Sequence, residues 1–259
     1  MTKKQTLKVT GVLLISGAIL VNIPYALLIT TFDYPDILRA PTADILTKFA
    51  AGGPELIWTW LAFAWVGLPL LLGILLLPHA LGDDDPSAPG RLSGNLAWFF
   101  GVTGALAQII GLLRWPFVVP VLAQTYTAPQ ATEQTREAVA AVFQVVHQYG
   151  GVVLGEHIGQ TFTILWMILL SFSLLRQGKS PRWLSWAGFA VAGIYTLAQA
   201  ELLATALPAF PVWDSAGLVG SLSWLGWLIA LGIVLLRQTR SRAYEYTGQN
   251  PQRRVSALQ

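Results

Sequence analysis

The chain has 259 residues, of which 54% are hydrophobic and only 11% are charged, and its formal net charge is +3. An average soluble domain has roughly 25% charged residues, so this chain has too few to cover a globular surface in water. It contains no cysteine, which excludes disulfides, thiolate metal sites and cysteine nucleophiles. A bilayer accepts apolar surface when backbone hydrogen bonds are made internally. We therefore predict an all-α membrane protein, with the lipid bilayer as its surroundings and no nucleic-acid partner.

Six apolar segments are long enough to cross a bilayer, which takes about 20 residues per helix. They lie at about 8–31, 55–81, 94–122, 150–176, 183–207 and 217–237. The first follows Lys3, Lys4 and Lys8 as a signal peptide would, but its apolar run is too long and no small-residue cleavage motif ends it. We expect a single transmembrane domain over residues 1–237, followed by a disordered basic tail over residues 238–259.

Lysine and arginine are unevenly distributed between the connections. An even number of spans puts both tails on one side, and that side carries twelve of the sixteen basic residues: Lys3, Lys4, Lys8, Arg91, Arg176, Lys179, Arg182, Arg237, Arg240, Arg242, Arg253 and Arg254. Cytoplasmic loops carry the excess of positive charge in most membrane proteins. We therefore expect both termini in the cytoplasm.

Two connections on the opposite, outer side are longer than the topology requires. In residues 32–54, a short helix can begin near residues 41–44 and end at residues 52–54, which read Gly-Gly-Pro. In residues 132–149, Thr132 is a candidate N-cap, and apolar residues then recur at helical spacing. We predict two amphipathic helices that lie on the outer membrane surface or over the bundle.

A short motif occurs twice in the spans. Leu106-Ala107-Gln108 in the third span matches Leu197-Ala198-Gln199 in the fifth. A repeat of two-helix hairpins would explain the match, and so would chance in a sequence rich in leucine and alanine.

Ionisable and polar side chains inside the spans are costly, and each is therefore a candidate functional residue. They are Arg114 in the third span, Glu156, His157 and Gln160 in the fourth, Glu201 in the fifth, and Glu55 at the start of the second. The alternating direction of the spans places the ionisable members of this set toward the outer side. These six residues form the candidate ligand-binding site.

Arg114 lies just before Pro116, which cannot donate to the carbonyl of Leu112 and so bends or ends the helix. In a structural interpretation, Arg114 pairs with Glu156 or Glu201 and ties the helices together. In a functional interpretation, the loosened helix opens an outward-facing pocket that binds an anionic or polar ligand against Arg114. Both interpretations predict that Arg114 faces the bundle interior with a carboxylate partner.

The fourth span carries two lengthwise patterns. Gly151, Gly155 and Gly159 recur every fourth residue and form a smooth face that lets another helix backbone approach closely. A polar stripe runs beside that face and consists of Glu156, Gln160 and Thr163. The glycine face can pack within the bundle or against a second copy in a homo-oligomer, and we favour internal packing.

Signals for catalysis and cofactors are weak. The three histidines, His79, His147 and His157, do not have the spacing of a metal site, and facing histidines for a haem are missing. We therefore expect no metal and no cofactor. Glu156 and His157 could perform acid–base chemistry, but adjacent helical residues diverge by about 100°. We favour binding of a lipid, small molecule or partner protein, with an enzyme acting on a lipid-like substrate or a small transporter as alternatives.

Three stretches resemble a known family. They are FDYPDILRAPTADILTKFAAGGP from Phe32, LGEHIGQTFTILWMILLSFSLLR from Leu154 and SPRWLSWAGFAVAGIYTL from Ser180. They resemble the bacterial membrane proteins grouped as domain of unknown function DUF4386, from the first span through the fifth. The resemblance implies a multi-spanning protein of the bacterial inner (plasma) membrane. It implies no catalytic residues and leaves the activity open.

Overall fold

The computed structural model describes residues 1–82, 91–178 and 180–248, and every regular element in that part of the chain is a helix. Six helical segments are long and apolar enough to cross a membrane, and we refer to them as spans one to six. They are Lys3–Phe32, Thr42–Leu81, Leu92–Thr127, Glu133–Gln177, Arg182–Ala204 and Ala216–Thr239. The predicted all-helical architecture with six spans is confirmed.

Most spans consist of more than one helix. Span one contains α1 (Lys3–Leu20) and α2 (Asn22–Phe32), span two α3 (Thr42–Trp65) and α4 (Gly67–Leu81), and span three α5 (Arg91–Phe117) and α6 (Val119–Thr127). Span four contains α7 (Glu133–Val146), the π-helix η2 (His147–Ile158) and α8 (Gly159–Gln177). Span five contains α9 (Arg182–Leu197) and α10 (Gln199–Ala204), and span six is part of α11 (Ala216–Gly248). A 3-10 turn, η1 (Asp36–Arg39), lies between spans one and two.

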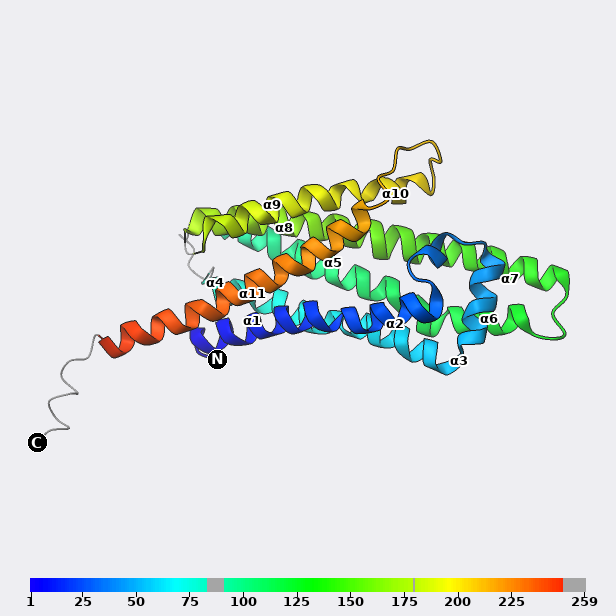
Figure 1. Cartoon of the computed structure of the whole chain (residues 1–259), viewed down its shortest axis with the longest axis horizontal. Coiled ribbons are helices and arrows are strands. Elements are labelled where there is room, and N and C mark those ends of the chain that lie inside the picture. The colour runs from blue at the N-terminus through cyan, green and yellow to red at the C-terminus, as the bar shows by residue number, and fades with distance from the viewer. Residues whose placement is uncertain (83–90, 179, 249–259) are drawn as a thin grey trace, which may run out of the picture.

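The spans form a closed ring in chain order. Helix α1 packs on α4, α4 on α5, α5 on α8, α8 on α9, and α9 on α11, which returns to α1. The beginning of α1 and the end of α11 lie at the same end of the elongated bundle, as an even number of spans requires (Figure 1). We call this the terminal end and the opposite one the far end. That the terminal end faces the cytoplasm stays a prediction.

Two buried clusters hold the ring together. The first draws apolar side chains from all six spans, and Leu14, Trp166 and Leu231 are among those that fill its centre. The second lies at the far end, where α2, α3, α6 and α7 meet (Figure 1). It is rich in aromatic rings, and the indoles of Trp60 and Trp115 stack with their centroids 4.5 Å apart.

The far end extends beyond the thickness of a bilayer core. Span four has 45 residues, which corresponds to about 65 Å of helix, whereas the hydrocarbon layer is about 30 Å thick. If the terminal end lies at one membrane surface, much of the aromatic second cluster therefore lies outside the hydrocarbon.

The chain contains two Gly-Gly pairs in or next to the spans, Gly52-Gly53 and Gly150-Gly151, and their backbone conformations differ. At the first pair, Gly53 has φ 56° and ψ −155°, so the helix that begins at Thr42 changes direction there. Proline disfavours helical geometry at the residue before it, and Pro54 supplies this constraint. The predicted short helix and its end at residues 52–54 are confirmed, while its position on the outer side stays a prediction.

At the second pair, Gly150 and Gly151, the chain stays helical and passes through η2 into α8. The N-cap at Thr132 is confirmed, since its hydroxyl accepts from the amide of Thr135 at 3.2 Å. The helix expected over residues 132–149 is present as α7, which continues directly into span four, while its position on the outer side stays a prediction. No proline follows this Gly-Gly pair to break the helix.

The ends of α5 and α11 can also be compared with the sequence-based predictions. The break expected near Pro116 is found at Val118, which separates α5 from α6. At the other end, α11 continues to Gly248, so the first part of the tail predicted to be disordered is helical. Residues 238–247 contain no glycine or proline to stop the helix. The rest of that prediction, over residues 249–259, lies outside the described residues.

The glycine face of span four packs inside the bundle, against α5. A Cβ added to Gly111 would lie only 2.5 Å from the Cα of Gly155, and one added to Gly159 would lie 2.5 Å from the Cγ of Gln108. These approaches confirm the preference for internal packing. They also fix the depth at which residues of α5 meet residues of η2.

Adding one methyl group at this contact should destabilise the fold. Gly111→Ala places a Cβ against backbone, which cannot move aside, so we expect the free energy of unfolding to fall by about 1–3 kcal/mol. Gly193→Ala is the matched control, because nothing lies within 4 Å of its added Cβ. Unfolding in mixed detergent micelles measures both variants, and equal stability of the two would contradict the close packing of α5 on η2.

Candidate functional site

The connection between spans one and two, residues 33–41, lies across the far end of the bundle, and we call it the strap (Figure 1). Ile37 and Leu38 are buried in the second cluster. The carbonyl of Leu38 lies 3.1 Å from Nε2 of His147, in hydrogen-bond contact. At its first residue, Asp33 pairs with Lys48 of α3. The strap is therefore attached to both span two and span four.

Arg39 of the strap makes ion pairs with two spans. Its Nη2 lies 3.1 Å from Oε2 of Glu156 in span four and 3.1 Å from Oε1 of Glu201 in span five. The side chains of Arg39, Glu156 and Glu201 are 32%, 22% and 46% exposed, so the group is accessible from the surface. One guanidinium thus binds two predicted site carboxylates and fixes the strap to both spans.

Arg114 lies deeper, between α5 and η2. It is only 8% exposed, and its Nη1 donates to the carbonyl of Gly111 at 2.6 Å. A Cβ on Gly151 would lie 2.5 Å from its Nη2, so the guanidinium fits against η2 only because that position is glycine. Among the described residues, its buried Nε has no hydrogen-bond partner.

The prediction that Arg114 pairs with a carboxylate is wrong. Arg114 does face the bundle interior, but within the described part of the chain no carboxylate forms an ion pair with it. Arg39 binds both Glu156 and Glu201 instead, because the strap places a second guanidinium next to them. A buried cation without a direct counter-charge is costly.

A second polar group joins spans four and five. The amide oxygen of Gln199 lies 2.8 Å from Nδ1 of His157, and its nitrogen donates to the amide oxygen of Gln160 at 2.6 Å. On the opposite side of span four, Nε2 of Gln108 donates to the hydroxyl of Thr163 at 2.9 Å. The polar stripe predicted on span four is therefore divided between two neighbours.

The other predicted residue, Glu55, lies apart from this group. It is exposed on α3, one residue beyond Pro54, and among the described residues it takes part in no ion pair. The structure thus brings Glu156 and Glu201 together through Arg39, and His157 and Gln160 together through Gln199.

Several residues of the site were missed from the sequence. Gln108 and Gln199 occupy the same position of the repeated Leu-Ala-Gln motif, and each bonds to span four from one side. That motif was the signal for them. Arg39 gave no comparable signal, because a charged residue in a connection is ordinary.

Tyr34 of the strap also lies close to the charged groups. Burial and the neighbouring Glu156 carboxylate raise the pKa of its phenol above the usual value. The phenol therefore stays neutral near pH 7, when it can still donate a hydrogen bond.

The site coincides with η2, the π-helical part of span four. This segment contains His147, Glu156 and His157 as well as the glycines that receive Arg114. π-Helical turns are rare and frequently occur at functional sites. Because their hydrogen bonds run from residue i to i+5, they also shift which side chains share a face.

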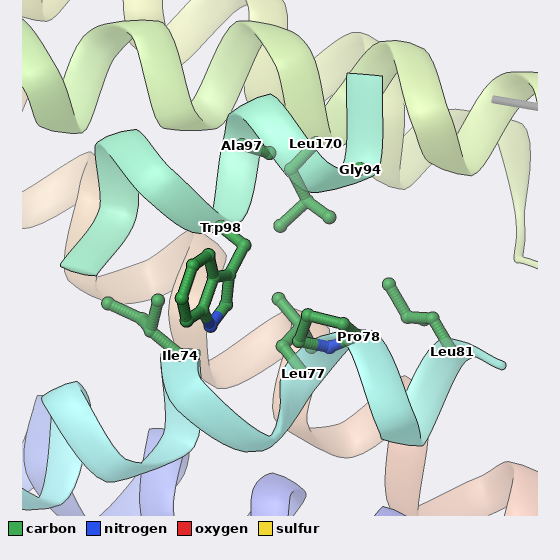
Figure 2. A pocket seen from close by; sticks show the side chains of 8 residues that line it. All are labelled: Ile74, Leu77, Pro78, Leu81, Gly94, Ala97, Trp98 and Leu170. Atoms are coloured by element: carbon green, nitrogen blue, oxygen red, sulfur yellow. The ribbon is translucent and has the colours of Figure 1, made fainter. Parts of the chain in front are cut away.

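Two hollows lie elsewhere in the bundle. One is enclosed by apolar side chains of α4, α5 and α8, including Leu77, Trp98 and Leu170 (Figure 2). Its volume of about 10 Å³ leaves room for at most one water molecule. The other, of about 430 Å³, is an open apolar surface beside Val12 and Leu236. Neither contains a residue of the polar site.

The bridge formed by Arg39 predicts a specific energetic coupling. In a double-mutant cycle, Arg39→Met and Glu156→Gln should couple by about 0.5–1 kcal/mol in the free energy of unfolding, as expected for a partly exposed ion pair. The coupling should fall at high salt because exposed charges are screened. Arg39→Met with Glu55→Gln is the control and should show none, so equal coupling in the two cycles would refute the bridge.

The comparisons with known proteins concern the chain as a whole. The family model described as domain of unknown function (DUF4386) matches residues 9–232, from α1 into α11 and across all six spans. No curated protein and no solved structure matches the chain. The match agrees with the resemblance noted in the strap, η2 and α9. The chain belongs to the DUF4386 family.

Proposed function

We propose that this protein is a membrane-embedded binding protein that takes the anionic group of a ligand, a phosphate or a carboxylate, against Arg114. The supporting observation is the environment of that guanidinium. It is 8% exposed and its Nε has no acceptor in the part of the chain that the structure describes, while Arg39 binds Glu156 and Glu201. An anionic ligand would supply the missing counter-charge. The planar donors of arginine match both kinds of anion.

The depth of the site supports a lipid headgroup as the source of that anion. About 30 Å of helix separates Glu156 from Gln177, at roughly 1.5 Å per residue, and this equals the thickness of the hydrocarbon layer. A site one hydrocarbon thickness away from the terminal end lies level with the phosphates of the opposite leaflet. A small soluble anion could also reach this level from the surface.

The position of the protein is part of the proposal. We place it in the bacterial inner membrane with both tails in the cytoplasm, so that the site lies in the outer half and the strap is an outer connection. The basic residues of the tails support this orientation. The common end of α1 and α11 is compatible with it (Figure 1).

Binding accounts for the geometry better than acid–base catalysis or transport. Glu156 is held by Arg39 and His157 by Gln199, so the two adjacent residues serve different partners. For transport, a path would have to cross the centre of the ring, where Trp166 and Leu231 are almost fully buried.

Removal of Arg114 should weaken retention of an anionic lipid. We expect the full-length protein, purified in a mild detergent, to retain phosphatidylglycerol in native mass spectra, and Arg114→Met to lower its affinity roughly ten- to hundredfold, as for a lost hydrogen bond to a charged group. Gly151→Ala should also weaken binding, since its Cβ would meet the guanidinium. A parallel titration with inorganic phosphate, without anionic lipid, separates a soluble anion from a headgroup.

Arg136→Met is the matched control, because Arg136 of α7 is only partly buried and donates to the carbonyl of Tyr126. It should bind phosphatidylglycerol as the wild type does. Binding in either the lipid or the phosphate arm that depends on Arg114 supports the proposal. Unchanged binding in Arg114→Met, with a thermal stability that shows the variant is folded, would overturn it.

A further inference from the structure

One carboxylate in the site interacts with two arginines. Glu156 contacts Arg39 at 3.1 Å. It is also the acidic side chain that interacts electrostatically with Arg114. The backbone explains this proximity, because Gly155 packs on Gly111, one helical turn before Arg114.

The two arginines differ in what holds them. Arg114 is buried between α5 and η2 and is fixed by its bond to Gly111. Arg39 belongs to the strap and is 32% exposed, so it is carried away from the spans when the strap moves. If the strap lifts, Glu156 loses Arg39 and the cation that remains near it is Arg114.

We propose that Arg39 is a positioning residue for the anion site: by holding Glu156, it leaves Arg114 free for an anion, so that anion binding and strap closure favour each other. This inference rests on the proposed function. Arg39 itself does not contact the anion. With the strap open, the carboxylate of Glu156 competes with the ligand for Arg114.

The coupling is reciprocal for thermodynamic reasons. Whatever factor strap closure adds to the affinity for the anion, the anion adds to the equilibrium for strap closure. Polar contacts hold the strap closed: Arg39 binds Glu156 and Glu201, and the Leu38 carbonyl contacts His147. The ion pair between Arg39 and Glu156 links the strap to the site, because Glu156 also interacts with Arg114.

The test is a binding cycle with phosphatidylglycerol titrated into the full-length protein in phosphatidylcholine nanodiscs. Arg39→Met should weaken binding about fivefold or more, a typical coupling between two sites. Glu156→Gln should bind at least as tightly as the wild type, because the competing carboxylate is gone. In the double variant, loss of Arg39 should have no further effect, since the carboxylate that interacts with Arg114 is gone.

A direct role of Arg39 would give a different pattern. If Arg39→Met weakens binding equally in the wild-type protein and in the Glu156→Gln variant, Arg39 contacts the ligand or acts through general stability, and the inference is overturned. If the wild type shows no Arg114-dependent binding, the proposed function itself fails. Arg136→Met again serves as the control arginine and should leave affinity unchanged.

Hydrogen exchange of the strap supplies a readout that a purely structural role would not move. Its amides donate within the strap, for example Leu38 to the carbonyl of Pro35 and Ala40 to that of Ile37. In the wild type, phosphatidylglycerol should slow exchange in the peptide that covers residues 33–41. In Arg39→Met it should not, and slowing of equal size in both proteins would overturn the inference.

Discussion

The backbone contact between spans three and four determines where the charged groups of this protein lie. At Gly111 and Gly155 the two helices approach so closely that a Cβ on Gly111 would lie 2.5 Å from the Cα of Gly155. One turn further along α5, the Arg114 side chain must then lie against η2, where Gly150 and Gly151 leave space for it. The glycines thus hold a guanidinium in the interior at a fixed depth.

Because Arg114 is buried at this depth, the contacts of the strap determine which groups lie beside it. A buried arginine usually takes a carboxylate partner, and Glu156 interacts electrostatically with Arg114. The strap prevents this by placing Arg39 on Glu156 and Glu201. Its own position is maintained by the aromatic second cluster, in which Ile37 and Leu38 are buried. The packing of the far end therefore decides which of two arginines is neutralised.

Much of the fold could be predicted from the sequence, because apolar runs of bilayer length and the preference of proline for particular positions are local properties. The six spans and the turn before Pro54 are of this kind. The continuous span four was not predictable in the same way, because Gly150 and Gly151 carry no local sign of π-helical geometry. Whether a glycine pair breaks a helix depends on what packs against it, and here Gly111 and Arg114 occupy that space.

Most residues of the site could be predicted from the sequence, but the ion pairs and hydrogen bonds between them could not. Depth in the membrane follows from sequence order, and so Arg114, Glu156 and Glu201 were placed at a common level. Which oxygen meets which nitrogen depends on the path of the strap over the bundle. That path is a tertiary property, and it brings Arg39 to the two carboxylates from a connection with no visible signal. Glu55 lies just beyond the turn at Gly53, and its separation from the group is likewise a tertiary property that the sequence does not show.

The central claim is that Arg114 is kept free of carboxylates so that it can receive an anion. The most direct measurement is an experimental structure of the full-length protein in nanodiscs that contain phosphatidylglycerol, at a resolution that shows headgroups. The account predicts a phosphate within hydrogen-bond distance of the Arg114 guanidinium, with Arg39 on Glu156 and the strap closed. An Arg114 side chain paired with Glu156 in that structure, with no headgroup beside it, would contradict the account.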